Sequence, residues 1–205
     1  MEFLIAVLIF AITTGITPGP NNIMIMTSGL NFGVRNSLPH YLGICFGFPA
    51  MVVLIGFGFG FVFDKYPILH LIIRIAGITY LLYLSWVIAN AAPNSFETKN
   101  SKPLSFLQAV LFQWVNPKAW IMATGSIAAF TTPASDIYLQ ILTIALIFFL
   151  LAFITTGTWL FFGVWLQKFL KDPSHQRVFN VTMAVLLVLS ITPSTINFVS
   201  EYLSL

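Results

Sequence analysis

Charged residues are scarce in this chain, and their scarcity excludes most classes of soluble protein. Only 7% of its 205 residues are Asp, Glu, Lys or Arg, whereas 58% are hydrophobic. A soluble domain normally carries about a quarter charged residues. The basic residues are scattered singly and form no patch or stripe, so no nucleic-acid partner is expected. The composition predicts one polytopic membrane domain over residues 1–205.

Cysteine, histidine and intramembrane acids are equally rare, which excludes several other functions. The single cysteine, Cys45, cannot form an internal disulfide or a paired redox site. The three histidines are too dispersed for a desaturase or a metal exporter, and no pair of acids suited to an intramembrane protease lies within an apolar stretch. We therefore expect no enzyme, no catalytic residues, no metal site and no cofactor.

Six apolar stretches are each long enough to cross roughly 30 Å of hydrocarbon, which takes about 20 helical residues. They lie near residues 3–30, 38–62, 67–91, 105–130, 137–165 and 177–198. A polar loop at 92–104 divides them into repeat halves of three helices, about 1–91 and 105–205. Because three is an odd number, related halves would insert in opposite orientations. The sequence thus predicts an all-α membrane protein of six transmembrane helices built as two inverted repeats.

The distribution of basic residues predicts the orientation of these helices. The loops after the first, third and fifth stretches hold Arg35, Lys99, Lys102, Lys168, Lys171 and Arg177. The opposite side holds Lys65 alone among basic residues. Since lysine and arginine favour cytoplasmic loops, both termini are predicted to lie outside.

Two helix-breaking motifs interrupt apolar stretches in which a membrane helix should be continuous. Thr17-Pro18-Gly19-Pro20-Asn21-Asn22 lies inside the first stretch, and Asn116-Pro117-Lys118 lies inside the fourth. Broken backbone at membrane depth is tolerated only inside protein or beside a hydrated cavity. Paired breaks in matching positions of two halves indicate a transporter binding site at mid-membrane. Pro20 can be laid over Pro117, which supports the inverted repeat.

Each break predicts a helix restart whose free N–H groups attract an anion. Thr17 and Asn116 are expected to cap the two restarts, and Pro117 suits the first helical position. The N–H groups and the dipole favour a carboxylate, while free carbonyls near Gly15 and Trp114 suit an ammonium. A zwitterionic amino acid would match both. The predicted substrate-binding residues are Thr17, Gly19, Asn21, Asn22, Asn116 and Lys118, around the helix-breaking Pro18, Pro20 and Pro117.

Lys118 is the most informative ionisable residue, because it lies roughly 15 Å from either predicted interface. An intramembrane lysine is a functional candidate by default, the alternative being a structural lysine that satisfies carbonyls at the break. His40 is able to carry a proton, but surface anchoring is the favoured interpretation. Thr155 and Thr156 are predicted either to line a cavity or to bond back to their own helix.

Small residues in the second stretch indicate close helix packing. Gly43-x-x-x-Gly47 and Gly56-x-x-x-Gly60 have the spacing that lets membrane helices approach closely. Packing within the chain is the favoured interpretation, and a homodimer through this glycine-rich helix is the alternative.

Several motifs together carry a family resemblance across nearly the whole chain. They are Thr17-Pro18-Gly19-Pro20-Asn21-Asn22, Gly29-x-x-x-Gly33-x-Arg35, Gly43-x-x-x-Gly47, Gly77-x-x-Tyr80-Leu81-x-Tyr83-Leu84-x-Trp86 and Phe112-x-x-x-Asn116-Pro117-Lys118-x-Trp120. In order and spacing the chain resembles the LysE/RhtB family of bacterial amino-acid exporters, in particular its RhtB-like branch. The resemblance implies six helices in the inner membrane and export of small metabolites, usually coupled to the proton gradient.

The absence of acids at depth bears on the substrate. A cationic amino acid would need an acidic partner there, so neutral amino acids of the cysteine, serine, threonine or branched type are favoured. The sequence predicts a secondary exporter that works by alternating access. The alternatives are an exporter of another small metabolite or of a cationic amino acid, and a membrane scaffold or sensor that transports nothing.

Overall fold

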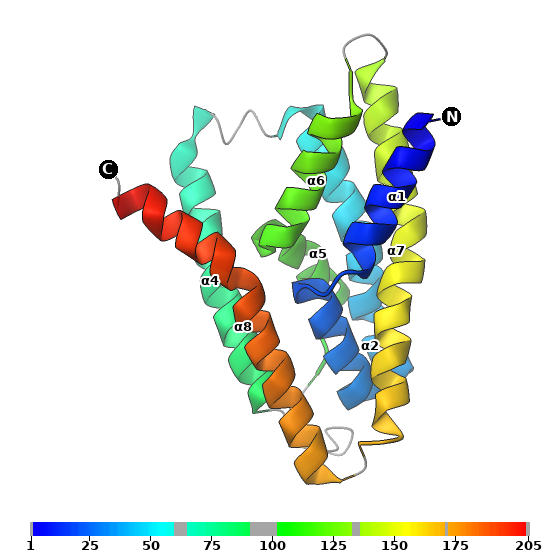
Figure 1. Cartoon of the computed structure of the whole chain (residues 1–205), viewed down its shortest axis with the longest axis vertical. Coiled ribbons are helices and arrows are strands. Elements are labelled where there is room, and N and C mark those ends of the chain that lie inside the picture. The colour runs from blue at the N-terminus through cyan, green and yellow to red at the C-terminus, as the bar shows by residue number, and fades with distance from the viewer. Residues whose placement is uncertain (1, 60–64, 91–101, 133–135, 171, 204–205) are drawn as a thin grey trace.

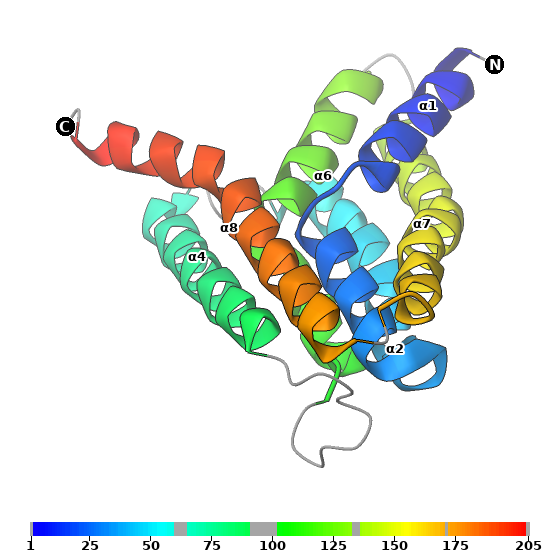
Figure 2. The same ribbon diagram turned by 60° about the horizontal axis from the view of Figure 1, so that its bottom comes forward.

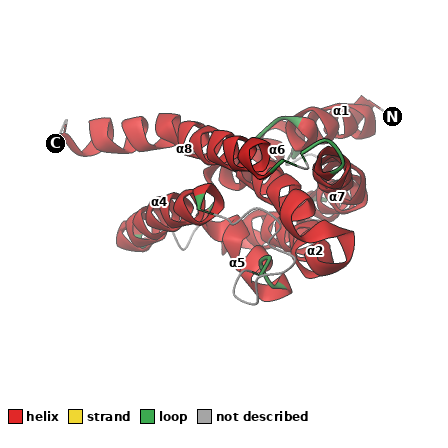
Figure 3. Ribbon diagram, turned by 90° about the horizontal axis from the view of Figure 1, so that it is seen from below, coloured by secondary structure: helices red, strands yellow, loops and turns green. Residues whose placement is uncertain are grey.

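The fold is an assembly of helices packed side by side. A computed structural model describes residues 2–59, 65–90, 102–132, 136–170 and 172–203, and these ranges contain helices and loops but no strand (Figure 3). The helices are α1 (Glu2–Ile16), α2 (Pro20–Leu54), the π-helical turn η1 (Ile55–Phe59), α4 (Pro67–Ala89), α5 (Phe106–Val115), α6 (Pro117–Phe130), α7 (Ile137–Gln167) and α8 (Pro173–Leu203). The divide predicted at 92–104 lies mostly outside the described residues.

The helices are apolar enough for a membrane. Four of them, within Pro20–Gly58, Leu71–Ala89, Ile137–Gln167 and Pro173–Thr192, are long enough to cross a bilayer, and Glu2–Ile16 and Phe106–Val115 are shorter apolar helices. Many large apolar side chains point outward, among them Ile9, Leu107 and Ile154, each more than 60% exposed. A lipid environment satisfies such surfaces, and water does not. The chain is therefore an all-α membrane protein.

Helix α2 is a hairpin of two arms that turns at Gly33. Gly33 has φ 72° and ψ 177°, a conformation open essentially to glycine alone. The hydroxyls of Ser28 and Ser37, nine positions apart, are 2.7 Å from each other. A straight helix would separate them by about 14 Å along its axis. The predicted stretches 3–30 and 38–62 are thus joined by a tight turn, and Figure 2 shows the second arm returning beside the first.

Helix α7 packs along both arms of α2, and glycines bring the backbones together. A Cβ on Gly163 would collide with the backbone of Met26, and a Cβ on Gly29 would collide with the backbone of Leu160. Helices α4 and α8 form a second pair that lies beside this unit and diverges from α6 toward the C-terminus (Figure 1). The α2–α7 contact is therefore the tight centre of the fold.

We expect Gly163→Ala to lower the stability of the folded protein. The added methyl group would meet backbone atoms of Met26 and the amide nitrogen of Leu30, which cannot rotate away. The cost should reach about 2 kcal/mol or more, as for other overpacked sites. Gly125→Ala is the matched control, because nothing lies within 4 Å of a Cβ there. Thermal unfolding in detergent should show a lower Tm for Gly163→Ala alone; equal Tm values would contradict this account of the α2–α7 contact.

The glycines of the predicted second stretch pack against other helices of the same chain. A Cβ on Gly43 would lie 2.6 Å from the Cβ of Ala109, and one on Gly47 would lie 2.8 Å from the Cα of Val110, both on α5. A Cβ on Gly56 would lie 2.6 Å from the side chain of Ile141 on α7. Gly60 lies outside the described residues. These contacts are the internal packing favoured from the sequence.

Candidate functional site

Both predicted interruptions are present, and they lie next to each other at the centre of the molecule. Helix α1 ends at Ile16 and α2 begins at Pro20, while α5 ends at Val115 and α6 begins at Pro117. Asn116 caps α6 as expected, because its side chain accepts a hydrogen bond of 3.1 Å from the backbone N–H of Lys118. Pro117 occupies the first position of α6, as expected, and Pro20 occupies the first position of α2.

The expected cap at Thr17 is wrong, because α2 is preceded by Gly19 instead. Gly19 is extended, with φ −177° and ψ 177°, and provides no side-chain cap. A residue before proline is disfavoured from helical geometry, so Pro20 places the boundary at Gly19. The hydroxyl of Thr17 donates to the carbonyl of Thr14 at 2.8 Å. The first N–H groups of α2 are consequently left without a capping side chain.

Lys118 crosses from the second break to the first. Its Nζ donates to the backbone oxygen of Thr17 at 2.6 Å, to Oγ1 of Thr17 at 2.8 Å and to the backbone oxygen of Pro18 at 3.5 Å. Its side chain lies over Gly19, where a Cβ would come within 2.6 Å of Cδ of Lys118. All three acceptors are neutral. The positive charge of Lys118 therefore meets no counter-ion in the described part of the chain.

A reciprocal amide pair ties the same two breaks together in the other direction. Nδ2 of Asn21 donates to Oε1 of Gln113 at 2.8 Å, and Nε2 of Gln113 donates to Oδ1 of Asn21 at 3.2 Å. Gln113 is fully buried in the last turns of α5. Sequence reasoning missed Gln113, although a glutamine one turn before a break in an apolar helix was a usable signal. The second residue of each restarted helix thus bonds the end of the other broken helix.

The carbonyls expected to stay free at the ends of α1 and α5 already accept hydrogen bonds. Nδ2 of Asn22 donates to the backbone oxygens of Gly15 and Thr17, both at 2.8 Å. Nε1 of Trp159 donates to the oxygen of Ile16 at 3.2 Å, and Nε1 of Trp120 donates to that of Trp114 at 2.7 Å. The expectation of free carbonyls is wrong at Gly15, Ile16 and Trp114, because side chains of this chain donate to them.

A cavity opens beside the two breaks. It offers about 50 Å³ to the centre of a water-sized sphere, and one water needs roughly 10–15 Å³ by this measure. Its polar wall consists of Thr14, Gly15, Gly19, Asn21, Asn22, Asn116, Lys118, Thr155 and Thr156. Its apolar wall consists of Ala11, Ile44, Phe48, Ala119, Met122, Phe148, Leu151 and Ala152. The cavity suits a small solute with a polar end and an uncharged remainder.

The structure brings five of the six predicted binding residues to this cavity. Gly19, Asn21, Asn22, Asn116 and Lys118 line it, whereas Thr17 lies outside the lining and holds the amine of Lys118. Thr155 and Thr156 also line it, and Thr155 bonds its own helix at Leu151 as well. No carboxylate is among the lining residues that the structure describes.

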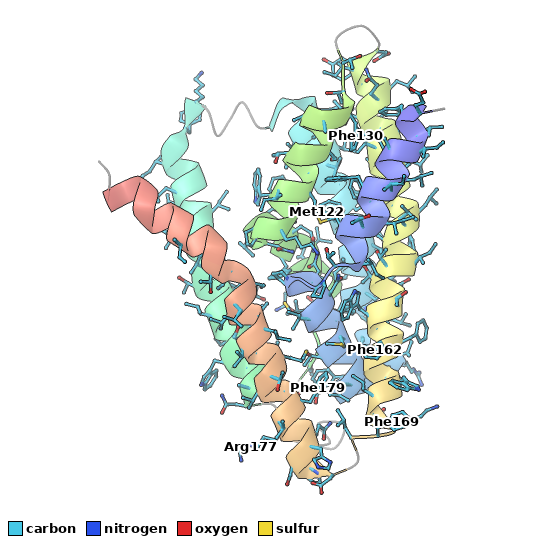
Figure 4. The ribbon with its side chains drawn as sticks, in the orientation of Figure 1. Met122, Phe130, Phe162, Phe169, Arg177 and Phe179 are labelled. Atoms are coloured by element: carbon cyan, nitrogen blue, oxygen red, sulfur yellow. The ribbon has the colours of Figure 1, made fainter. Side chains whose placement is uncertain are left out.

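Aromatic rings pack beside the cavity, toward the N-terminal end of α1. Phe148, in the cavity wall, packs edge-on against Phe48 with ring centroids 5.0 Å apart. Phe10 packs against Phe148 at 6.4 Å and against Phe130 at 5.5 Å. Figure 4 shows Met122 on α6 nearer the centre of the molecule and Phe130 at the far end of that helix. The rings thus lie between the cavity and one end of the molecule.

The sequence favoured a surface position for His40, and this prediction is wrong. The residue is 2% exposed, and neither ring nitrogen has a hydrogen-bond partner within the described residues. Its helical face also carries Ser37, which bonds Ser28 on the first arm of α2, and Ile44, which packs with Ile25 there. The hairpin at Gly33 therefore folds the first arm over this face, and that burial depends on a turn that local sequence patterns do not reveal.

Comparison with known proteins places these features among transporters. The model of the family described as LysE type translocator matches residues 12–190. Cysteine/O-acetylserine efflux proteins of Escherichia coli (strain K12), Shigella flexneri and Shigella sonnei (strain Ss046) are each 26% identical over 180 residues, which cover 87% of this chain and 90% of each relative. No solved structure shows a significant match.

Proposed function

Because the chain belongs to the LysE family of translocators, we propose that it exports small neutral amino acids or close derivatives across the bacterial inner membrane. The observation that carries this proposal is the cavity at the two helix breaks. It joins an uncapped helix start and a lysine without a counter-ion to an apolar wall. The names of the similar efflux proteins, which refer to cysteine and O-acetylserine, agree with such a substrate.

The substrate carboxylate would bind where Lys118 meets the start of α2. Gly19 gives this helix start no capping side chain, so its N–H groups and positive dipole end are available to an anion. Lys118 adds a full charge, and hydrogen bonds to charged groups are roughly twice as strong as neutral ones. Replacing the neutral oxygens of Thr17 and Pro18 by a carboxylate would pair that charge.

The ammonium and the side chain of an amino acid would bind to different parts of the cavity wall. Oδ1 of Asn22 accepts no hydrogen bond from the described residues, and the hydroxyl oxygens of Thr155 and Thr156 line the same cavity, so an ammonium has acceptors there. A small side chain would lie against Met122 and Ala152. A cationic side chain would be desolvated without a carboxylate partner, which makes lysine and arginine poor substrates.

Alternating access would follow from two inverted repeats of three helices. The overlay of Pro20 on Pro117 places Asn21 over Lys118, and these two residues make corresponding contacts, each with the end of the other broken helix. Rocking of one half against the other would break and remake those contacts around a fixed midplane site. The energy source we propose is the proton gradient across the membrane.

The proposed orientation puts both termini outside. Phe169 and Arg177 lie at one end of the molecule, opposite the N-terminus (Figures 1 and 4). Trp165 and Phe169 are 50% and 63% exposed there, and their rings pack at 4.6 Å. Exposed aromatic residues beside Lys168 and Arg177 are typical of a cytoplasmic membrane interface. The cavity then lies at the inner ends of α1 and α6 and beside the middle of α7, near the midplane of the membrane.

Efflux from intact cells tests the function. Cells with this protein or an empty vector would be preloaded through dipeptides, and release of cysteine, serine, threonine, alanine, leucine, lysine and arginine would be followed. We expect faster loss of one or a few neutral amino acids, with lysine and arginine at vector level. Export of lysine or arginine without any neutral amino acid would defeat the proposed specificity, and no faster loss of any of the seven would defeat amino-acid export.

A further inference from the structure

His40 is a buried imidazole that the substrate site does not use. It is 2% exposed and both its nitrogens lack hydrogen-bond partners in the described structure. A buried polar group without a partner costs free energy and calls for an explanation, such as a proton-transfer role. The other buried side-chain atom without a partner in the same ranges is Oγ1 of Thr27, on the first arm of α2. Two unsatisfied polar groups on one hairpin mark a segment that is incompletely paired in this conformation.

The position of His40 connects the cavity to the cytoplasmic end. Residues 37, 40, 44 and 48 share one face of the second arm of α2. Ile44 and Phe48 line the cavity, so His40 lies one helical turn beyond the cavity wall. Ser37, a turn further on, makes the 2.7 Å bond to Ser28 that holds the two arms together. Separation of the arms at this bond would open His40 to the basic, cytoplasmic end of the molecule.

Few titratable residues occur on the elements packed around this position. The first arm of α2, α5 and η1 contain no titratable residue. Tyr41 donates its hydroxyl to the backbone oxygen of Phe153 at 2.8 Å, and Lys118 is held at Thr17. The remaining titratable or charged residues on α2 and on the helices packed against it are Arg35, Cys45, Tyr138, His175, Arg177, Glu201 and Tyr202.

We propose that His40 is the proton-carrying residue that couples export to the proton gradient, an inference that rests on the proposed function. One proton from the outer side binds a nitrogen of the neutral imidazole while the cavity faces outward and the substrate leaves. The same proton is released to the cytoplasm once the arms of α2 separate and the cavity faces inward. An imidazolium enclosed as in this structure would have no counter-ion, which favours its exposure to water on one side or the other. Inward movement of one proton thereby accompanies outward movement of one substrate.

The test separates substrate exchange from proton-driven accumulation in proteoliposomes. Radiolabelled L-cysteine under reducing conditions and radiolabelled L-serine are the probes. Exchange is measured at equal pH on both sides, and accumulation is measured with an acidic vesicle interior. The variants are His40→Gln and His40→Leu, and His175→Gln is the matched control because His175 is exposed at the start of α8. Gel filtration and thermal unfolding verify folding.

We expect both His40 variants to lose accumulation driven by the pH gradient while exchange stays near the wild-type rate, and His175→Gln to keep both. Accumulation that persists in the His40 variants overturns this inference alone, as does loss of exchange together with accumulation. A wild-type protein that exchanges without responding to the pH gradient also overturns it. Absence of exchange of either probe by the wild type counts against the proposed function itself, and the inference falls with it.

Discussion

Lys118→Met should reduce export of the preferred amino acid by about a hundredfold while leaving the protein folded in the membrane. Methionine keeps most of the length and apolar volume of lysine but removes the ammonium that would pair with the substrate carboxylate. A hydrogen bond to a charged group contributes about 1.5–3 kcal/mol, and each 1.4 kcal/mol corresponds to roughly tenfold in affinity. The expected loss lies at the upper end of this energy range, because the described lining of the cavity contains no second cation.

Cell efflux at matched membrane expression measures this effect. Lys168→Met is the control, since Lys168 is exposed at the end of α7 and lies outside the cavity lining. Lys118→Arg should restore part of the activity, because it keeps the charge but carries a broader head group over Gly19. Normal export by Lys118→Met would show that this lysine is a structural group that satisfies the carbonyls of Thr17 and Pro18.

The contacts of Lys118 suggest how substrate binding and domain movement are linked. In this structure its ammonium bonds the end of α1, and Asn21 bonds the end of α5. A carboxylate that binds Lys118 must compete with the oxygens of Thr17 and Pro18, so binding would loosen one of the two ties between the breaks. A ligand shifts a conformational equilibrium only through such differential contacts. The tie between Asn21 and Gln113 would still join the two breaks until the halves rock.

The helix breaks could be predicted from the sequence because their signals are local. Proline at a first helical position and asparagine before it specify a helix start within three residues. The ties between the breaks could not be predicted, since Asn21 and Gln113 are 92 positions apart and meet only through packing. The prediction of a cap at Thr17 is wrong because the sequence offers two prolines, Pro18 and Pro20, at which the helix can begin. The helix begins at Pro20, and Gly19 before it is extended.

The burial of His40 shows a different limit of sequence reasoning. A histidine near the start of an apolar stretch is ordinarily close to an interface, and that position favoured a surface role. The turn at Gly33 uses a single residue, so the two arms of α2 are already in contact at Ser28 and Ser37. Glycine at position 33 was visible, but its φ of 72° is a property of the folded chain. The burial of His40 is therefore set by tertiary structure and not by its position in the sequence.

Ala152→Phe should strongly reduce export by filling the apolar end of the cavity. Ala152 is 8% exposed and belongs to the apolar wall of the cavity, together with Phe148 and Leu151. The free space is about 50 Å³ for the centre of a water-sized sphere, so a phenyl ring there would take the place of the substrate side chain. We expect at least about a tenfold loss of efflux, the effect of blocking a binding pocket by more than 1.4 kcal/mol.

Graded variants at this position distinguish blocking from misfolding. Ala152→Gly should widen the cavity and shift preference toward larger neutral side chains such as leucine, because one methylene in an apolar pocket changes selectivity by about 10- to 200-fold. Ala128→Phe is the matched control, since Ala128 is exposed on α6 and outside the cavity lining. Efflux of the amino-acid panel, compared at equal membrane expression, measures all three. Unchanged export and unchanged preference in both Ala152 variants would show that the substrate side chain binds elsewhere, because a ring and a hydrogen atom cannot leave the same contact surface intact.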